Sequence, residues 1–172
     1  MDVVYLDNNA TTSVAAEVIE AMTPFLTEHY YNPSSMYEPA RIPADALEEA
    51  RRTIARLLGA RHGREILFTS CATESNNTAL IGTLQASPSR RHVITTAVEH
   101  PAVLNVAQEL ARRGWEVDFL SVDRHGRLDI SDFVRTLRPD TALVSIMHAN
   151  NETGVVFPVE QLARLAKETD PG

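Results

Sequence analysis

Lysine is almost absent from this sequence. Of the 16 basic residues in the 172-residue chain, Lys167 is the one lysine and the others are arginines. The 16 basic residues face 23 acidic ones, the formal net charge is -7, and no basic cluster outweighs that balance. A surface of this charge repels phosphate backbones, so we expect no nucleic acid partner.

Cysteine is as scarce as lysine. Cys71 is the single cysteine, which excludes an internal disulfide and a multi-cysteine metal site. The six histidines are scattered rather than paired at ligand spacing, so we expect no metal site. No window approaches the length of a membrane-spanning helix, and no basic segment followed by a long apolar one opens the chain. We therefore expect a soluble, cytoplasmic protein with no membrane partner.

The first 65 residues are expected to contain an arm and two helices. The arm covers residues 2–12, and the first helix follows Ser13, which is placed to cap it. A loop at 32–35 contains a proline, and an amphipathic helix at 44–58 ends at Gly59.

From residue 65 onward, apolar runs alternate with helical patterns. We expect strands at 66–69, 92–96, 116–120 and 142–147, and helices at 74–84, around 103–111, at 131–137 and at 159–168. Alternation of this kind implies parallel strands with right-handed crossovers. The sequence therefore predicts the α/β fold class, with a mostly parallel sheet and flanking helices.

The segment 66–77 runs from an apolar stretch through hydroxyl residues into a helical pattern. The first turn of such a helix presents free N–H groups and the positive end of the helix dipole, and Ser70, Thr73 and Ser75 add hydroxyl donors. These groups suit a phosphate. Neither a Walker lysine nor a dinucleotide glycine pattern is present, which favours a phosphorylated cofactor. An ordinary capped strand-to-helix turn explains the segment equally well.

Two further polar loops follow predicted strands at the same sheet edge. His100 precedes Pro101 at a helix start, where its imidazole could stack on a planar ring or shuttle a proton; the alternative is a helix-capping histidine. Asn150 and Asn151 offer amide donors for a phenolate-like oxygen, or form an Asx turn before Gly154.

Five segments together resemble the signature of cysteine desulfurases of the NifS/IscS type, in the class V aminotransferase family. They lie in order along nearly the whole chain, at residues 5–12, 32–35, 68–76, 98–104 and 145–154. The resemblance implies a type I, aspartate-aminotransferase fold that binds pyridoxal 5'-phosphate. It also implies that residues 1–13 are an arm belonging to the small domain, and that residues 14–172 are the N-terminal portion of the coenzyme-binding large domain.

The same resemblance implies a reaction and partners. Family members convert L-cysteine to L-alanine and leave a protein persulfide, whose sulfur passes to an iron–sulfur scaffold protein. By matching motif, Ala72 and Thr73 would hold the coenzyme phosphate, His100 would stack on the ring and assist proton transfer, and Asn151 would bond the phenolic oxygen.

Three other residues of the phosphate motif are expected to have structural roles. Glu74 and Ser75 are assigned a capping or structural role. Cys71 is interpreted as a small packing residue rather than the nucleophile, because the family carries its persulfide cysteine on a mobile loop much further along the chain.

Pyridoxal phosphate enzymes need a lysine to hold the coenzyme aldehyde. Lys167 lies in a predicted helix among charged residues, on what should be its solvated face, so we expect that it does not reach the site. We therefore expect an incomplete N-terminal portion of a desulfurase, acting as a homodimer or with a complementing C-terminal chain. The alternatives are a related pyridoxal phosphate enzyme, such as a selenocysteine lyase or an aminotransferase, and a non-catalytic remnant that dimerises with a full-length desulfurase.

Overall fold

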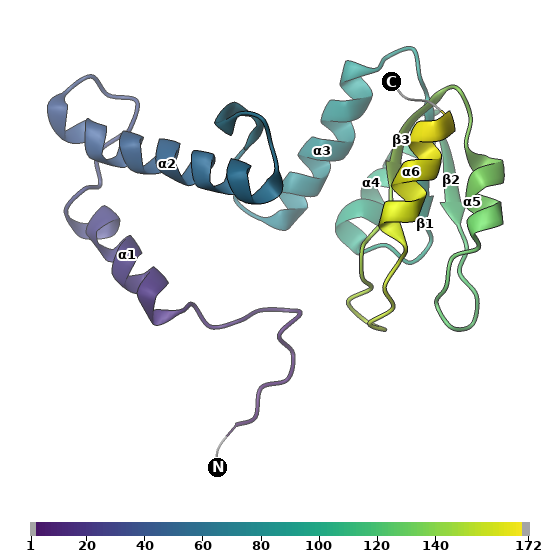
Figure 1. Cartoon of the computed structure of the whole chain (residues 1–172), viewed down its shortest axis with the longest axis horizontal. Coiled ribbons are helices and arrows are strands. Elements are labelled where there is room, and N and C mark those ends of the chain that lie inside the picture. The colour runs from purple at the N-terminus through teal and green to yellow at the C-terminus, as the bar shows by residue number, and fades with distance from the viewer. Residues whose placement is uncertain (1–2, 170–172) are drawn as a thin grey trace. The chain divides into compact units, whose positions relative to one another are not determined.

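The computed structural model describes residues 3–169 and divides into two compact units, Met1–Phe68 and Thr69–Gly172 (Figure 1). Each unit is considered by itself. Within residues 3–169, no helix is both long and apolar enough to cross a membrane. The predicted division after residue 13 stays a prediction.

The first unit is helical. Its elements are α1 (Ala16–Thr27), the 3-10 helix η1 (Glu38–Ala40), α2 (Arg41–Leu58) and the 3-10 helix η2 (Gly63–Glu65). The prediction that α2 ends at Gly59 is confirmed, since Gly59 adopts a left-handed φ of 71° there. The prediction that Ser13 caps α1 is wrong. Ala15 occupies the cap position and makes no side-chain bond, because the helix begins further along the chain than the apolar spacing suggested.

The strand predicted at residues 66–69 does not form. Ile66 has an extended backbone, but no described segment pairs with it. Arg51 holds this stretch instead, because its guanidinium donates to the Ile66 carbonyl and lies 4.8 Å from the centroid of the Phe68 ring. A strand is defined by its ladder to a neighbour, so an apolar run without a partner stays an extended loop.

The second unit is built on a parallel sheet, as predicted, with three strands among the described residues in place of the four expected. Its strands are β1 (His92–Thr96), β2 (Glu116–Leu120) and β3 (Thr141–Ser145), in the order β2-β1-β3, and both pairings are parallel. Its helices are α3 (Ala72–Ala86), α4 (Pro101–Arg112), α5 (Ile130–Thr136) and α6 (Val159–Thr169).

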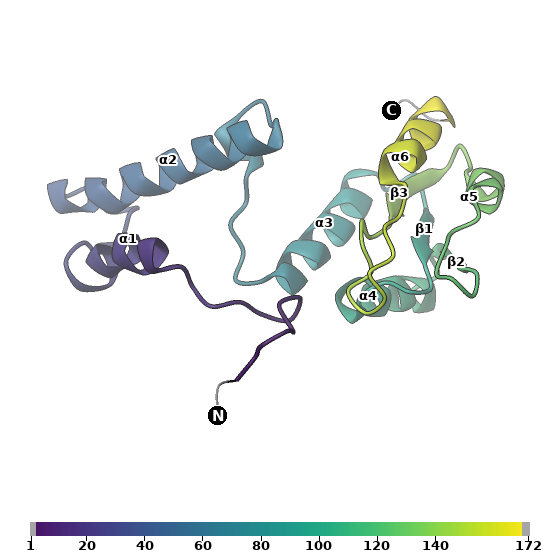
Figure 2. The same cartoon turned by 60° about the horizontal axis from the view of Figure 1, so that its bottom comes forward.

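The helices of this unit cover both faces of the sheet (Figure 2). Neighbouring residues of β1 point to opposite faces. Ile94 packs with Phe133 of α5 and Leu162 of α6, whereas Val93 packs with Leu84 of α3 and Leu110 of α4. The central strand is buried throughout, which explains its almost continuous apolar and β-branched sequence. Because both pairings are parallel, the carboxyl ends of all three strands lie at the same edge of the sheet.

Candidate functional site

The first turn of α3 is shaped by a carboxylate. Glu74 accepts bonds from the Ser70 hydroxyl at 2.6 Å and from the Ser70 N–H at 2.7 Å, and these bonds lower the pKa of its carboxyl group. The Ser75 hydroxyl bonds the Thr69 hydroxyl and the Cys71 carbonyl. The hydroxyls of Ser70 and Ser75, predicted as phosphate donors, are thus engaged within the loop. Of the capping or structural role predicted for Glu74 and Ser75, these contacts support the structural one, because the N-cap residue Cys71 makes no side-chain cap bond.

Cys71 occupies the N-cap of α3 and is exposed, so its interpretation as a packing residue is wrong. The pKa of its thiol is lowered, chiefly by the backbone N–H of Glu74 and next by the Ser70 hydroxyl. Donors at this helix end therefore stabilise negative charge. No group of three or more metal-ligating side chains is found within residues 3–169.

His100 caps α4, and this is the alternative that the sequence left open. Its Nδ1 accepts the Ala102 N–H at 3.1 Å, while Pro101 fills the first helical position. Because Nδ1 accepts, the neutral ring carries its proton on Nε2. The cap therefore leaves Nε2–H as the group that the imidazole can offer to a ligand.

Thr73 and His100 line one groove between α3 and α4, with a volume of about 940 Å³. Thr73 lies in the first turn of α3, and His100 lies directly before α4. The groove wall also includes Asn77, Asn105 and Trp115, to which the sequence assigned no role. Thus the structure brings two of the four predicted site residues to the same hollow. Ala72, the first residue of α3, directly precedes Thr73.

Asn150 and Asn151 lie in the loop after β3, outside the lining of this groove. Asn150 forms the Asx turn, because its Oδ1 accepts the N–H groups of Glu152 at 3.0 Å and Thr153 at 2.9 Å. Asn151 is exposed, and its Nδ2 donates to the Glu152 Oε1 at 2.9 Å. Asn151 is not among the residues that line the groove of Thr73 and His100.

Glu99 is a buried carboxyl group to which the sequence assigned no role. Its Oε1 accepts the Thr96 hydroxyl at 3.1 Å and the Met147 N–H at 2.8 Å, and burial raises its pKa. The sequence held one signal for such a role, because Glu99 is an acidic residue that lies between a buried strand and the pair His100-Pro101.

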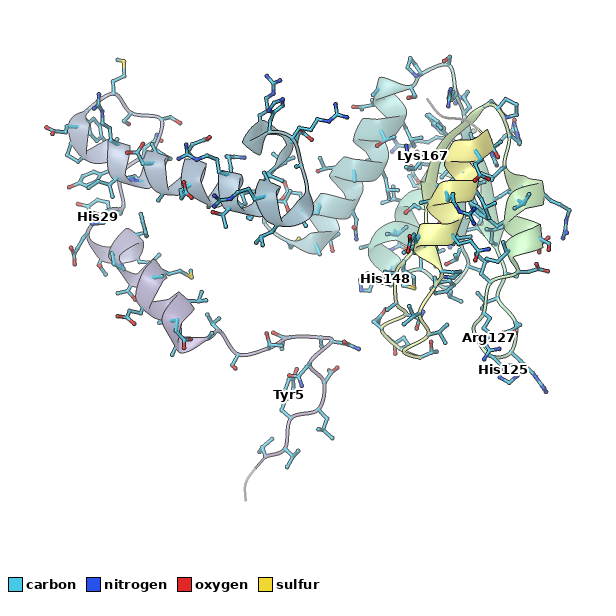
Figure 3. The ribbon with its side chains drawn as sticks, viewed as in Figure 1. Tyr5, His29, His125, Arg127, His148 and Lys167 are labelled. Atoms are coloured by element: carbon cyan, nitrogen blue, oxygen red, sulfur yellow. The ribbon has the colours of Figure 1, made fainter. Side chains whose placement is uncertain are left out.

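Lys167 belongs to another part of the unit. It lies in the last turn of α6 and lines a separate hollow that includes Arg90 and Thr141, the first residue of β3. Figure 3 shows Lys167 on α6, well above His148 in the view. The lysine therefore lies near the amino end of β3 and does not line the groove of Thr73 and His100, as predicted.

Comparison with known families agrees with the motifs. The model of the class-V aminotransferases matches residues 4–171. The chain belongs to this family. It is 54% identical over 168 residues to cysteine desulfurase 2 of Trichormus variabilis, and 53% identical over 165 residues to the cysteine desulfurase NifS of Azotobacter vinelandii.

Solved structures show the same fold. A NifS-like protein superposes with a TM-score of 0.92 at 40% identity, covering 98% of this chain and 46% of that protein. SspA in complex with cysteine gives a TM-score of 0.86 at 37% identity, covering 94% of this chain and 46% of SspA. The predicted fold class is therefore confirmed.

The matched region is a minor part of each relative's length. The alignments cover 98% of this chain and 42% of the Trichormus protein, and 96% of this chain and 41% of the Azotobacter protein. Family membership thus rests on nearly all of this chain. The roles of Ala72, Thr73, His100 and Asn151 stay predictions.

Proposed function

We propose that this chain supplies the phosphate- and ring-binding residues of a pyridoxal-phosphate-dependent cysteine desulfurase. The observation that supports it is the groove shared by Thr73, in the first turn of α3, and His100, at the cap of α4. This pairs an anion-stabilising helix start with an aromatic ring that carries a proton donor.

The described residues fit such a coenzyme. The N–H groups at the start of α3 support a phosphate site, since the backbone N–H of Glu74 is the main cause that lowers the pKa of the Cys71 thiol. The groove, at about 940 Å³, falls in the range of small-molecule sites. Its wall combines apolar side chains with as many polar or charged ones, among them Asn77 and Asn105.

The proposal gives each predicted residue one role. Ala72 and Thr73 would hold the phosphate with first-turn N–H groups and the Thr73 hydroxyl. His100 would stack on the ring and hold or pass a proton at Nε2, since Nδ1 is engaged by Ala102. Asn151 would donate to the phenolic oxygen after turning from Glu152. The bound coenzyme supplies the electron sink for chemistry at the substrate amino acid.

The lysine that holds the coenzyme aldehyde is not Lys167 in this proposal, because Lys167 lines the separate hollow beside Thr141. That lysine comes from residues outside this sequence, on the same polypeptide or on a complementing chain. L-cysteine is the proposed substrate, which the cysteine complex of the structural relative SspA supports. A homodimer, an iron–sulfur scaffold as sulfur acceptor and a cytoplasmic location complete the proposal.

Coenzyme binding is tested by titrating the chain with pyridoxal 5'-phosphate. Trp115, the single tryptophan, lines the groove, so its fluorescence should fall along a saturable curve. Thr73→Val removes one hydroxyl donor to a charged group and should weaken binding about tenfold. Thr136→Val, which removes a hydroxyl from half-buried Thr136 on α5, is the matched control and should bind as the wild type does. A wild-type chain without saturable quenching would overturn the proposal.

The reaction is tested in a chimera. The region of Azotobacter NifS that aligns with this chain is replaced by this chain, and products from L-cysteine are measured. Sulfide with L-alanine supports a desulfurase, whereas a keto acid points to an aminotransferase. A chimera that binds the coenzyme and forms no product supports the non-catalytic alternative. Lys167→Arg should leave the chimera's rate unchanged.

A further inference from the structure

Two side chains link the loop after β1 to the loop after β3. The first is Glu99, which is 7% exposed and follows β1. Its Oε1 accepts the backbone N–H of Met147, which follows β3, at 2.8 Å. The same oxygen accepts the hydroxyl of Thr96, the last residue of β1, at 3.1 Å. One carboxyl oxygen therefore ties the carboxyl ends of two adjacent strands together.

The second link runs in the opposite direction. Asn150, which is 8% exposed in the loop after β3, donates its Nδ2 to the backbone carbonyl of Val98 at 3.1 Å. Its Oδ1 accepts the Thr153 N–H, so the same amide group bonds within its own turn and to the loop after β1. Glu99 and Asn150 thus form a reciprocal pair of bonds, each from a side chain on one loop to the backbone of the other.

Each member of this pair directly precedes a predicted coenzyme contact. Glu99 is followed by His100, and Asn150 is followed by Asn151. We infer that Glu99 and Asn150 are positioning residues that hold His100 and Asn151 in a fixed relation at the carboxyl edge of the sheet. The inference rests on the proposed function, because it assumes that those two residues face the coenzyme.

The free-energy cost of burying Glu99 and Asn150 favours a positioning role for them over simple packing. A buried carboxyl group and a buried amide lose hydration that their bonds must replace, and an apolar pair would fill the same space without that loss. What polar bonds add is direction, because each fixes one backbone atom of the opposite loop. Groups that orient contact residues in this way typically matter about tenfold or more for the ligand.

The test uses variants that cut each bond selectively. Asn150→Asp loses the Nδ2 donor to Val98 but keeps an oxygen for the Thr153 N–H. Glu99→Ala removes the acceptor of the Met147 N–H, whereas Glu99→Gln retains an acceptor oxygen and serves as the conservative rescue. Asp129→Ala, which removes the N-cap bond of α5 to the Ser131 N–H, is a destabilising control away from the loops.

Three readouts separate positioning from stability. The first is the Kd for pyridoxal 5'-phosphate from Trp115 fluorescence. The second is the circular dichroism that the bound coenzyme acquires, per molecule bound, and it reports the geometry of its contacts. Hydrogen exchange at the Met147 amide is the third and reports the Glu99 bond directly.

For Asn150→Asp and Glu99→Ala we expect a Kd about tenfold higher and a weaker induced signal. Glu99→Gln should restore both, and Asp129→Ala should change neither. If Met147 exchanges faster in Glu99→Ala while the Kd and induced signal stay at wild-type values, the positioning role is overturned and the proposed function stands. Absence of saturable binding by the wild type would overturn the proposed function itself.

Discussion

Glu99 Oε1 accepts the Met147 N–H at 2.8 Å, so a side chain from the loop after β1 bonds the backbone of the loop after β3. Parallel strands bring their carboxyl ends to one edge, but the ladder stops where the strands stop. Beyond that point the loops need their own bonds. Here a buried carboxyl group supplies one, next to the histidine that caps α4.

The first prediction concerns the pH dependence of stability through Glu99. Burial raises its pKa in the folded state above the usual glutamate value of about 4.3. The folded protein therefore holds the proton more tightly than the unfolded chain. The stabilising contribution of this group is present below pH 4.3 or so and is lost as the pH rises through the raised folded value. Glu99→Gln removes this titration, so the free energy of unfolding of the wild type should fall relative to that of the variant as the pH rises from about 4.3 through the raised folded pKa. Urea unfolding at several pH values checks the trend, and a constant difference would contradict it.

The second prediction separates the two roles of His100. His100→Ala removes the cap on the Ala102 N–H and should lower the free energy of unfolding by about 1 kcal/mol. His100→Asn restores a good capping group and should recover most of that loss. Both variants lack the ring, so both should bind pyridoxal 5'-phosphate less tightly than the wild type. Urea unfolding and the coenzyme titration check the two roles separately. Asparagine restoring the affinity would show that the ring itself contributes nothing.

The third prediction concerns the core beneath α6. Leu162 is 3% exposed and packs with Ile94 and Phe133. Leu162→Ala should cost about 3 kcal/mol, the sum of lost burial and a cavity. Val134→Ala on α5 is the control, because Val134 is 45% exposed and should cost about 0.5 kcal/mol or less. Urea unfolding followed by Trp115 fluorescence measures both, and equal losses would contradict this core.

The fourth prediction uses two glycines that differ in backbone conformation. A Cβ at Gly82 in α3, or at Gly114 after α4, would meet no atom within 4 Å. Gly114 has a φ of +84°, so Gly114→Ala should destabilise the protein by about 1 kcal/mol. Gly82 lies inside α3, so Gly82→Ala should stabilise it by about 0.7 kcal/mol. Thermal unfolding of the two variants should show shifts of opposite sign.

Local pattern predicted much of the second unit. The apolar runs at 92–96 and 116–120 became β1 and β2 with the expected bounds, and the run at 142–147 became β3 at Thr141–Ser145. The pattern also placed His100 before a helix, since a histidine followed by Pro101 suits that position. Such features depend on residues close in sequence, and periodicity reports them directly.

Non-local contacts decided the rest. Residues 66–69 carry a strand pattern, yet no described segment pairs with them, and Arg51 bonds the Ile66 carbonyl instead. The hydroxyls of Ser70 and Ser75 were predicted to face a phosphate and are engaged within their own loop. Side-chain bonding depends on which partner lies nearest in space, and spacing along the chain does not specify that.

The sequence by itself determined the family, the parallel α/β class and the candidate residues Ala72, Thr73, His100 and Asn151, because motif and periodicity are written in neighbouring positions. Only the tertiary structure decided that Thr73 and His100 share a groove, and that Glu99 joins two loops. The physical reason is that the sheet brings residues from separate segments to one edge. There a hydrogen bond forms or fails according to distances of a few tenths of an ångström, which no sequence pattern records.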